Sequence, residues 1–329
     1  MKIVIPDDYQ NIVDQLACFS LIRHHDVTRY RAPARTLDEL AERLRDAEFV
    51  VSIRERVRFS RALIERLPKL KLIALVGRAS SRIDVAACTE HGVRVATGRS
   101  NAPESPAELA VALILASRRN LALEAERMRR GDWPCGLSHR LRGSTLGIFG
   151  LGAIGRLVAE AGRGLGMNVI AWGRQGTRET ARAAGFGAAA SKAELFEHSD
   201  VLSLHARLTP ETRGIVGSDD LARMKPSALI VNTARAELIA PGALVAALRA
   251  GRPGYAAVDV YEDEPIIGGD HPLLALPNAL CLPHLGGAEW EKFELYFSET
   301  FEQIAAYENG AELRLANPEV RARLSPGGR

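Results

Sequence analysis

The chain has 329 residues, of which 47% are hydrophobic and 25% charged, and its formal net charge is +3. This length predicts about two domains that each bury a core, and the composition is that of an ordinary globular protein. Arginines around 54–66 and 118–130 are interleaved with acidic residues. Because mixed charges indicate solvated helix faces, we expect no nucleic-acid partner.

Four cysteines, Cys18, Cys88, Cys135 and Cys281, are scattered without a CxxC pair or a histidine at ligand spacing. They predict free thiols in a reducing compartment and no metal site. The N-terminus begins as a strand rather than as a signal peptide, and no apolar run approaches about 18 residues. We therefore expect a cytoplasmic protein with no membrane contact.

Short apolar runs alternate with helical patterns in chain order, which predicts parallel strands joined by crossover helices. In the first part we expect strands at 2–5, 49–53, 70–76 and 93–96, and helices at 37–44 and 62–67. One long helix is predicted over 105–130, and it is too apolar for a surface helix, so we expect it between domains or in a subunit interface. Further strands are expected at 145–149, 168–172, 201–204, 229–232, 255–260 and 279–282. A last helix over 288–309 ends at Gly310, and the tail beyond it is expected to be loose.

A glycine fingerprint lies at the end of the 145–149 strand, where a helical pattern begins. Gly150 permits a tight turn, Gly152 lets the backbone approach a pyrophosphate, and Gly155 lets the helix pack on its strand. The N–H groups of Ala153 and Ile154 would then face the phosphates at the positive end of the helix dipole. The pattern predicts dinucleotide binding, although a bare structural turn is the alternative.

Three further polar residues follow predicted strands: Arg235, Glu264 and His284. Ligands of an open parallel sheet lie outside the carboxyl ends of its strands. A guanidinium can bind a substrate carboxylate, a histidine can donate a proton to a ketone, and a carboxylate can hold that histidine in one tautomer and favour its protonated form. Each residue alone has a structural explanation, and the prediction of 2-oxo acid reduction depends on their joint placement.

The sequence resembles the D-isomer-specific 2-hydroxyacid dehydrogenases over nearly its whole length. The matching pieces are Leu-Gly-Ile-Phe-Gly-Leu-Gly-Ala-Ile-Gly at 146–155, Met-Lys-Pro-Ser-Ala-Leu-Ile-Val-Asn-Thr-Ala-Arg at 224–235, Val-Asp-Val-Tyr-Glu-Asp-Glu-Pro at 258–265 and Pro-His-Leu-Gly-Gly at 283–287. The resemblance implies that Arg235 binds substrate, that Glu264 orients the catalytic histidine, and that His284 is the acid/base.

The resemblance also implies two doubly wound, Rossmann-like α/β domains, with the nucleotide domain at 103–287 inserted into a smaller substrate domain formed by 1–102 and 288–329. Arg54 is similar to the arginine of the family's cleft-facing loop, and Gly77 and Arg78 to its carboxylate-binding loop. Two departures concern the substrate more than the reaction. Residues 78–84 lack the usual Gly-x-Gly-like stretch, and Ala236 follows Arg235 where glycine is usual.

An NAD-specific site needs an acidic residue about 20 positions after the fingerprint. This chain has Gly173, Arg174 and Gln175 there, which is similar to the NADPH-preferring glyoxylate and hydroxypyruvate reductases. We expect NADP rather than NAD, because arginine accepts a 2′-phosphate that a carboxylate would repel. Arg174 stacking on adenine or pointing to solvent remains the alternative. Other cofactor contacts are expected at His205, Thr209, Thr233, Ala234, Asp259 and Gly286.

These observations predict an NAD(P)-dependent oxidoreductase that acts on CH–OH donors and reduces small 2-oxo acids, as a homodimer formed through the long apolar helix. Oxidation of phosphite or formate is an alternative on similar sequences, although the formate enzymes carry glutamine in place of Glu264. A nucleotide-sensing protein like the co-repressors of this fold is another. Which 2-oxo acid is used depends on loop shape.

Overall fold

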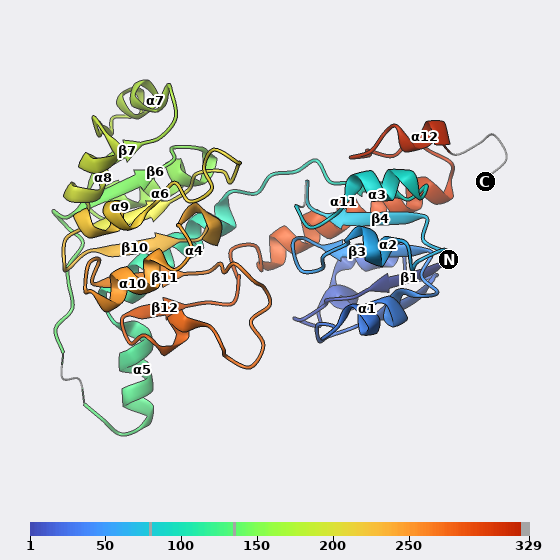
Figure 1. The fold of residues 1–329 in the computed structure, drawn as a ribbon, viewed down its shortest axis with the longest axis horizontal. Coiled ribbons are helices and arrows are strands. Elements are labelled where there is room, and N and C mark those ends of the chain that lie inside the picture. Colours follow the sequence, from blue (N-terminus) through green and yellow to red (C-terminus); the bar gives the residue numbers. More distant parts are fainter. Residues whose placement is uncertain (79–80, 134–135, 324–329) are drawn as a thin grey trace. The chain divides into compact units, whose positions relative to one another are not determined.

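The computed structural model describes residues 1–78, 81–133 and 136–323, and the chain divides into two compact units. Unit 1 consists of 1–102 together with the segment from Trp290 onward, and unit 2 is the continuous stretch 103–289 (Figure 1). Cys135, and the Ala79 and Ser80 of the loop after Arg78, lie outside the described residues. Unit 2 is therefore an insertion in the sequence of unit 1.

Unit 1 contains a parallel five-stranded sheet in the order β2-β1-β3-β4-β5. Its strands are β1 (Lys2–Ile5), β2 (Asp26–Arg29), β3 (Phe49–Ile53), β4 (Leu72–Val76) and β5 (Arg94–Thr97). All residues of β3 and β4 are buried, as expected for strands covered on both faces. The strand order reverses between β1 and β3, which places the loops after these two strands beside each other.

Two helices of unit 1, α1 and α3, begin at side chains that cap their free N–H groups. Thr36 accepts the N–H of Glu39, and Asp84 accepts the N–H of Ala87. The helical segments are η1 (Val13–Gln15), η2 (Ala17–Leu21), α1 (Leu37–Leu44), α2 (Arg61–Ile64), α3 (Val85–Glu90), α11 (Trp290–Glu308) and α12 (Val320–Arg323). The long α11 returns the chain to unit 1 and packs against β4 and η2.

Unit 2 contains a parallel seven-stranded sheet in the order β12-β11-β10-β9-β6-β7-β8. Its strands are β6 (Thr145–Phe149), β7 (Asn168–Trp172), β8 (Gly187–Ala188), β9 (Val201–Leu204), β10 (Leu229–Asn232), β11 (Tyr255–Val258) and β12 (Ala279–Cys281). The strand order reverses between β6 and β9, as in a doubly wound dinucleotide-binding sheet. Two doubly wound parallel sheets were expected, and the fold class is confirmed.

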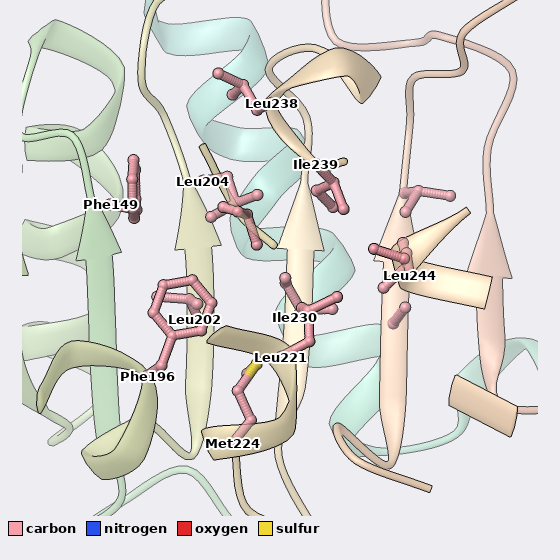
Figure 2. Packing of buried hydrophobic residues seen from close by; sticks show 14 of the residues in the cluster. Phe149, Phe196, Leu202, Leu204, Leu221, Met224, Ile230, Leu238, Ile239 and Leu244 are labelled. Carbon is pink, nitrogen blue, oxygen red and sulfur yellow. The ribbon is translucent and has the colours of Figure 1, made fainter. Parts of the chain in front are cut away.

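Helices cover both faces of this sheet. The helical segments of unit 2 are α4 (Glu104–Arg118), α5 (Leu121–Arg129), α6 (Ala153–Gly164), α7 (Thr177–Ala183), α8 (Lys192–His198), α9 (Ser218–Arg223), η3 (Ala236–Leu238), α10 (Ala243–Arg249) and η4 (Pro272–Ala275), and of these α5 has no buried residue. On one face, Phe196, Leu221 and Met224 pack over Leu202 and Ile230 of the central strands (Figure 2). Burying a side chain of this size contributes about 1.5–3 kcal/mol, so this layer holds the central strands firmly in register.

The expected long helix over 105–130 was wrong, because the structure has two helices, α4 and α5. Asn120 lies between them with φ 53°, a left-handed conformation that ends α4. The apolar side chains of α4, including Ala110, Leu113 and Ile114, are buried in the core of unit 2 itself. Their apolar character therefore needs no neighbouring subunit to explain it.

The tail after Gly310 was expected to be loose, and this was wrong for the part that the structure describes. Leu315 forms a bridge with Ala96, and α12 follows. Asn317 is fully buried, where its side chain accepts the N–H of Val95 and donates to the carbonyl of Val93. The edge strand β5 is thus covered by the tail.

Among the described residues, no helix is both long enough and apolar enough to cross a membrane.

Candidate active site

The first glycine of the fingerprint lies where the loops after β6 and β9 meet. Gly150 has φ 99°, and a Cβ on it would lie 2.8 Å from the amide nitrogen of Ala206 and 2.9 Å from the carbonyl carbon of His205. Both the backbone conformation and the close approach exclude a larger residue. The crevice at this change of strand order is the usual ligand position of such sheets.

The other two fingerprint glycines differ in what requires them. A Cβ on Gly155 would lie 2.2 Å from the carbonyl oxygen of Gly150, so this residue is needed for α6 to approach its strand. Gly152 has φ −86°, and its Cβ would meet no atom within 4 Å. Nothing in the described protein therefore requires glycine at 152, and the open space before the N–H groups of Ala153 and Ile154 fits a dinucleotide pyrophosphate.

The loop after β7 carries the residues expected to select the cofactor. Gly173 lies close to α7, since its Cβ would be 2.9 Å from Oγ1 of Thr177. Arg174 and Gln175 are exposed. The carbonyl of Arg174 accepts the N–H of Thr177, and its guanidinium makes no hydrogen bond or ion pair with any described residue. This arginine is thus available to a ligand at the end of β7.

The loops after β9 and β10 hold the expected contacts His205, Thr209, Thr233 and Ala234. The ring Nε2 of His205 lies 2.8 Å from Oγ of Ser203, and desolvation lowers the pKa of His205 to about 4. The hydroxyls of Thr209 and Thr212 lie 3.3 Å apart. Oγ1 of Thr233 is buried and makes no hydrogen bond with any described residue. This buried hydroxyl of Thr233 lies after β10, at the same edge of the sheet as the glycine fingerprint. A polar ligand bound at that edge would supply its missing hydrogen bond.

Arg235 begins a tight turn at the end of β10. The side-chain amide of Asn232 donates to the carbonyl of Arg235, and its oxygen accepts the N–H of Ala234. These two bonds fix the turn, and Nη1 of Arg235 donates to the carbonyl of Ala234 at 2.7 Å. The half-buried guanidinium therefore projects from a braced backbone at the carboxyl edge of the sheet.

His284 and Glu264 form the shortest contact between predicted catalytic side chains. Nδ1 of His284 lies 2.6 Å from Oε2 of Glu264, and Oε1 of Glu264 accepts the N–H of Tyr261 at 2.9 Å. The two side chains are only 23% and 15% exposed. His284 also has φ 55°, an uncommon conformation for a non-glycine residue that is enriched at functional sites. The pair leaves Nε2 as the ring nitrogen that is not turned toward Glu264.

Asp259 has a structural role that the sequence did not reveal. Its fully buried carboxylate accepts the N–H groups of Leu285 at 2.6 Å and Gly286 at 2.7 Å, the two residues after His284. Burial raises the pKa of Asp259, while these two hydrogen bonds lower it. The hydroxyl of Tyr261 donates to the carbonyl of Leu282 on the other side of the loop. The backbone around His284 is thus held from two sides.

Unit 1 holds the three expected substrate residues at the carboxyl edge of its own sheet. Arg54 follows β3 and has φ 52°, and Gly77 follows β4 with φ 134°. Arg78 is exposed and its side chain makes no hydrogen bond or ion pair with any described residue. The carbonyl of Gly77 accepts the N–H of Gly98 at 2.7 Å, which braces the loop.

A half-buried arginine and a buried aspartate lie at the same edge and were not among the predicted site residues. Nη1 of Arg56 donates to the carbonyl of Asp7 at 2.6 Å, and its guanidinium lies over the ring of Tyr9 at 4.7 Å. Burial raises the pKa of Asp7 to about 6. Their positions in the sequence could have indicated this, because Asp7 follows β1 and Arg56 follows β3, the two strands between which the strand order reverses.

Comparisons with known proteins agree with this architecture. Residues 111–286 match the family model of the D-isomer specific 2-hydroxyacid dehydrogenase NAD binding domain. The chain is 36% identical to a glyoxylate reductase of Aeropyrum pernix, over 80% of this chain and 82% of that protein. It is 38% identical to a D-3-phosphoglycerate dehydrogenase of Methanocaldococcus jannaschii over 82% of this chain, and there it spans only about half of the relative, 51%.

Among solved structures, a phosphoglycerate oxidoreductase of Vibrio cholerae is 46% identical, with a TM-score of 0.90 over 94% of this chain and 100% of that one. The family model covers more than half of the chain, and the glyoxylate reductase matches over most of both proteins. The chain therefore belongs to the D-isomer-specific 2-hydroxyacid dehydrogenases, NAD-dependent oxidoreductases that act on the CH–OH group of their donors.

Proposed function

We propose that the protein reduces small 2-oxo acids to D-2-hydroxy acids, with His284 as the acid that protonates the substrate oxygen. The observation that carries this proposal is the 2.6 Å contact between Nδ1 of His284 and Glu264. A carboxylate at Nδ1 keeps the proton of that nitrogen in place and directs Nε2 toward the substrate. General acid catalysis of this kind contributes about 10²–10⁴ in rate.

When bound, the nicotinamide cofactor supplies the hydride that the ketone carbon accepts. Arg235 binds the substrate carboxylate through its guanidinium, and Nε2 of His284 gives its proton to the ketone oxygen, which becomes the hydroxyl of the product. Glu264 holds the imidazole ring through the exchange, and His284 is reprotonated from solvent. A role in substrate binding is proposed separately for Arg54, the backbone of Gly77 and Arg78.

The cofactor preference that we propose is NADPH over NADH. Supporting it, no acidic residue occupies 173–177, and the exposed Arg174 has a guanidinium without a hydrogen bond or ion pair to described residues. The other cofactor contacts are the N–H groups of 152–155, together with His205, Thr209, Thr233, Ala234, Asp259 and Gly286. The role of Asp259 includes holding the loop that presents Gly286.

A panel of glyoxylate, hydroxypyruvate, pyruvate and an aromatic 2-oxo acid, each assayed with NADPH and with NADH, tests the proposal. Turnover of at least one of these acids, with a higher kcat/KM for NADPH, is the expected result. Phosphite and formate are assayed in the oxidative direction with NADP⁺ and NAD⁺. Oxidation of either one, without turnover of any 2-oxo acid, would refute the proposed reaction. Turnover with NADH alone would support the proposed reaction but refute the proposed preference for NADPH.

We also propose a homodimer, formed by α5 rather than by the buried face of α4. None of the residues of α5 is buried, and Leu121, Leu123 and Met128 are among its exposed apolar side chains. Exposed apolar side chains gathered on one element favour an interface. Sedimentation velocity should give the mass of a dimer, and Met128→Glu should shift it toward monomer. Leu37→Glu, at an exposed leucine on α1 of unit 1, is the control, and a monomeric wild type would refute the proposal.

A further inference from the structure

Two histidines and a glutamate meet in unit 1, and none of them is among the residues of the candidate active site. His24 and His25 lie on the segment between η2 and β2, and Glu308 is the last residue of α11. His24 and Glu308 are 284 positions apart in the chain. Each residue offers one ligand atom, and the three atoms all lie within 4.8 Å of one another.

The two nitrogen–oxygen distances of the cluster are those expected between ligands of one metal ion. Nε2 of His24 lies 3.4 Å from Oε1 of Glu308, and Nε2 of His25 lies 3.4 Å from Oε2 of the same carboxylate. For zinc bound at about 2.0–2.1 Å, two ligand atoms at the tetrahedral angle are separated by about 3.3–3.4 Å. An ordinary surface ion pair uses one imidazole, whereas here two imidazoles converge on a single carboxylate.

His25 supplies an independent observation. Its side chain is only 4% exposed, and its Nε2 is buried and makes no hydrogen bond with any described residue. Buried polar atoms in native structures normally make hydrogen bonds, so a buried nitrogen that meets only Oε2 of Glu308, at 3.4 Å and without a hydrogen bond, indicates a further ligand between the two atoms. His24 is 56% exposed, so water can reach the site and complete the coordination.

The charges around the site favour a cation. Within the described part of the chain, the ion pairs of Glu308 involve only His24 and His25, so no lysine or arginine competes for its carboxylate. Imidazole nitrogens and a carboxylate are the ligand types of Zn²⁺ and of neighbouring divalent transition metals, whereas Mg²⁺ and Ca²⁺ prefer oxygen ligands.

We propose that His24, His25 and Glu308 bind one divalent transition cation of the Zn²⁺ type, with water as the remaining ligand. The cation ties the segment before β2 to the end of α11, where the chain turns into the tail that covers β5. Its role is structural, because a link between positions so far apart in sequence closes a long loop of unit 1. No metal site was expected from the sequence, because the cysteines lack ligand spacing; the meeting of Glu308 with two histidines 283–284 positions away has no local sequence pattern.

The test uses the full-length protein, stripped of metal and titrated with Co²⁺ and then with Zn²⁺. His24→Ala and Glu308→Gln each remove one ligand from a partly exposed position, and circular dichroism and reductase kinetics check that both variants fold. The control is His198→Ala, which removes a histidine 3.9 Å from Glu194 with no second imidazole. Removing a residue that hydrogen-bonds to a metal ligand lowers the metal affinity about 10–100-fold. Removing a ligand itself should therefore lower it at least about tenfold.

We expect the wild type and His198→Ala to show a tetrahedral Co²⁺ absorption spectrum that Zn²⁺ abolishes, together with a higher melting temperature in Zn²⁺. Both ligand variants should lose the spectrum and the thermal shift at the same metal concentration. Wild-type Co²⁺ affinity in both ligand variants would overturn the proposal. Loss of the spectrum in His198→Ala as well would also overturn it, because the bound metal would then not be held at this site.

Discussion

Nδ1 of His284 lies 2.6 Å from Oε2 of Glu264, and the second oxygen of that carboxylate is held by the N–H of Tyr261. The glutamate is therefore fixed before it meets the imidazole, and the histidine ring has one available orientation. Its neighbour Asp259 fixes the backbone of the same loop. In this arrangement Glu264 positions the proposed acid, so that the imidazole ring of His284 is already oriented before the substrate reacts.

Glu264→Gln should lower kcat with little effect on cofactor affinity, because the amide can accept from Nδ1–H but no longer carries the charge that stabilises the protonated ring. The pH profile of kcat should change as well, which a merely structural role would not produce. Glu262→Gln is the matched control, since Glu262 contacts His271 at 3.3 Å rather than His284. Equal kcat values and pH profiles for the two variants would contradict the role of Glu264 in positioning His284.

Gly152→Ala should leave stability unchanged and weaken dinucleotide binding. The residue has an ordinary φ of −86°, and its Cβ would meet no protein atom within 4 Å, so only a ligand in front of α6 is affected. Gly150→Ala should instead destabilise the fold, because φ is 99° and the Cβ would clash with the loop after β9. Thermal unfolding and cofactor titration of both variants separate these effects. Wild-type affinity in Gly152→Ala would argue against a pyrophosphate at this loop.

Arg174→Ala should raise the KM for NADPH far more than the KM for NADH. A charge-assisted contact to a 2′-phosphate contributes about 1.5–3 kcal/mol, which corresponds to roughly a tenfold to hundredfold change. Arg178→Ala is the control, because that exposed arginine on α7 donates to the carbonyl of Ala190, which follows β8. Equal increases for the two cofactors would contradict phosphate binding by Arg174.

The stability of unit 2 should depend on pH through His205. Desolvation lowers its folded pKa from 6.5 to about 4, so the unfolded chain binds more protons between these values. The contribution is complete above pH 6.5 and is lost as the pH falls toward 4. His205→Gln should therefore lose less stability than the wild type between pH 7 and 5, as measured by urea unfolding, with exposed His198→Gln as the control. An identical loss in His205→Gln and wild type would contradict this.

Much of the fold could be predicted from the sequence, because the buried parallel strands are uninterrupted apolar runs. The strand over 145–149 and those over 168–172, 201–204 and 229–232 have their predicted bounds. β2 was missed because it is an edge strand in which only Val27 is apolar and no residue is fully buried. The break at Asn120 was missed because it depends on a left-handed backbone conformation, which a helical pattern does not reveal.

The hydrogen bonds that hold the candidate site in place could be predicted only in part. The positions of Glu264 and His284 after predicted strands, together with the motifs around them, predicted that the two residues are neighbours. Their contact is present in the structure. The hydrogen bonds of Asp259 to the next loop, and the meeting of His24 with Glu308, depend on how separate elements pack. No local pattern in the sequence carries that information.

The most direct test of the central claim is single-turnover reduction of a 2-oxo acid by wild type and His284→Ala, with cofactor affinity measured on the same samples. The account predicts a rate lower by about 10²–10⁴ in the variant and an almost unchanged dissociation constant for NADPH. A single-turnover rate equal to that of the wild type would contradict the assignment of His284 as the acid.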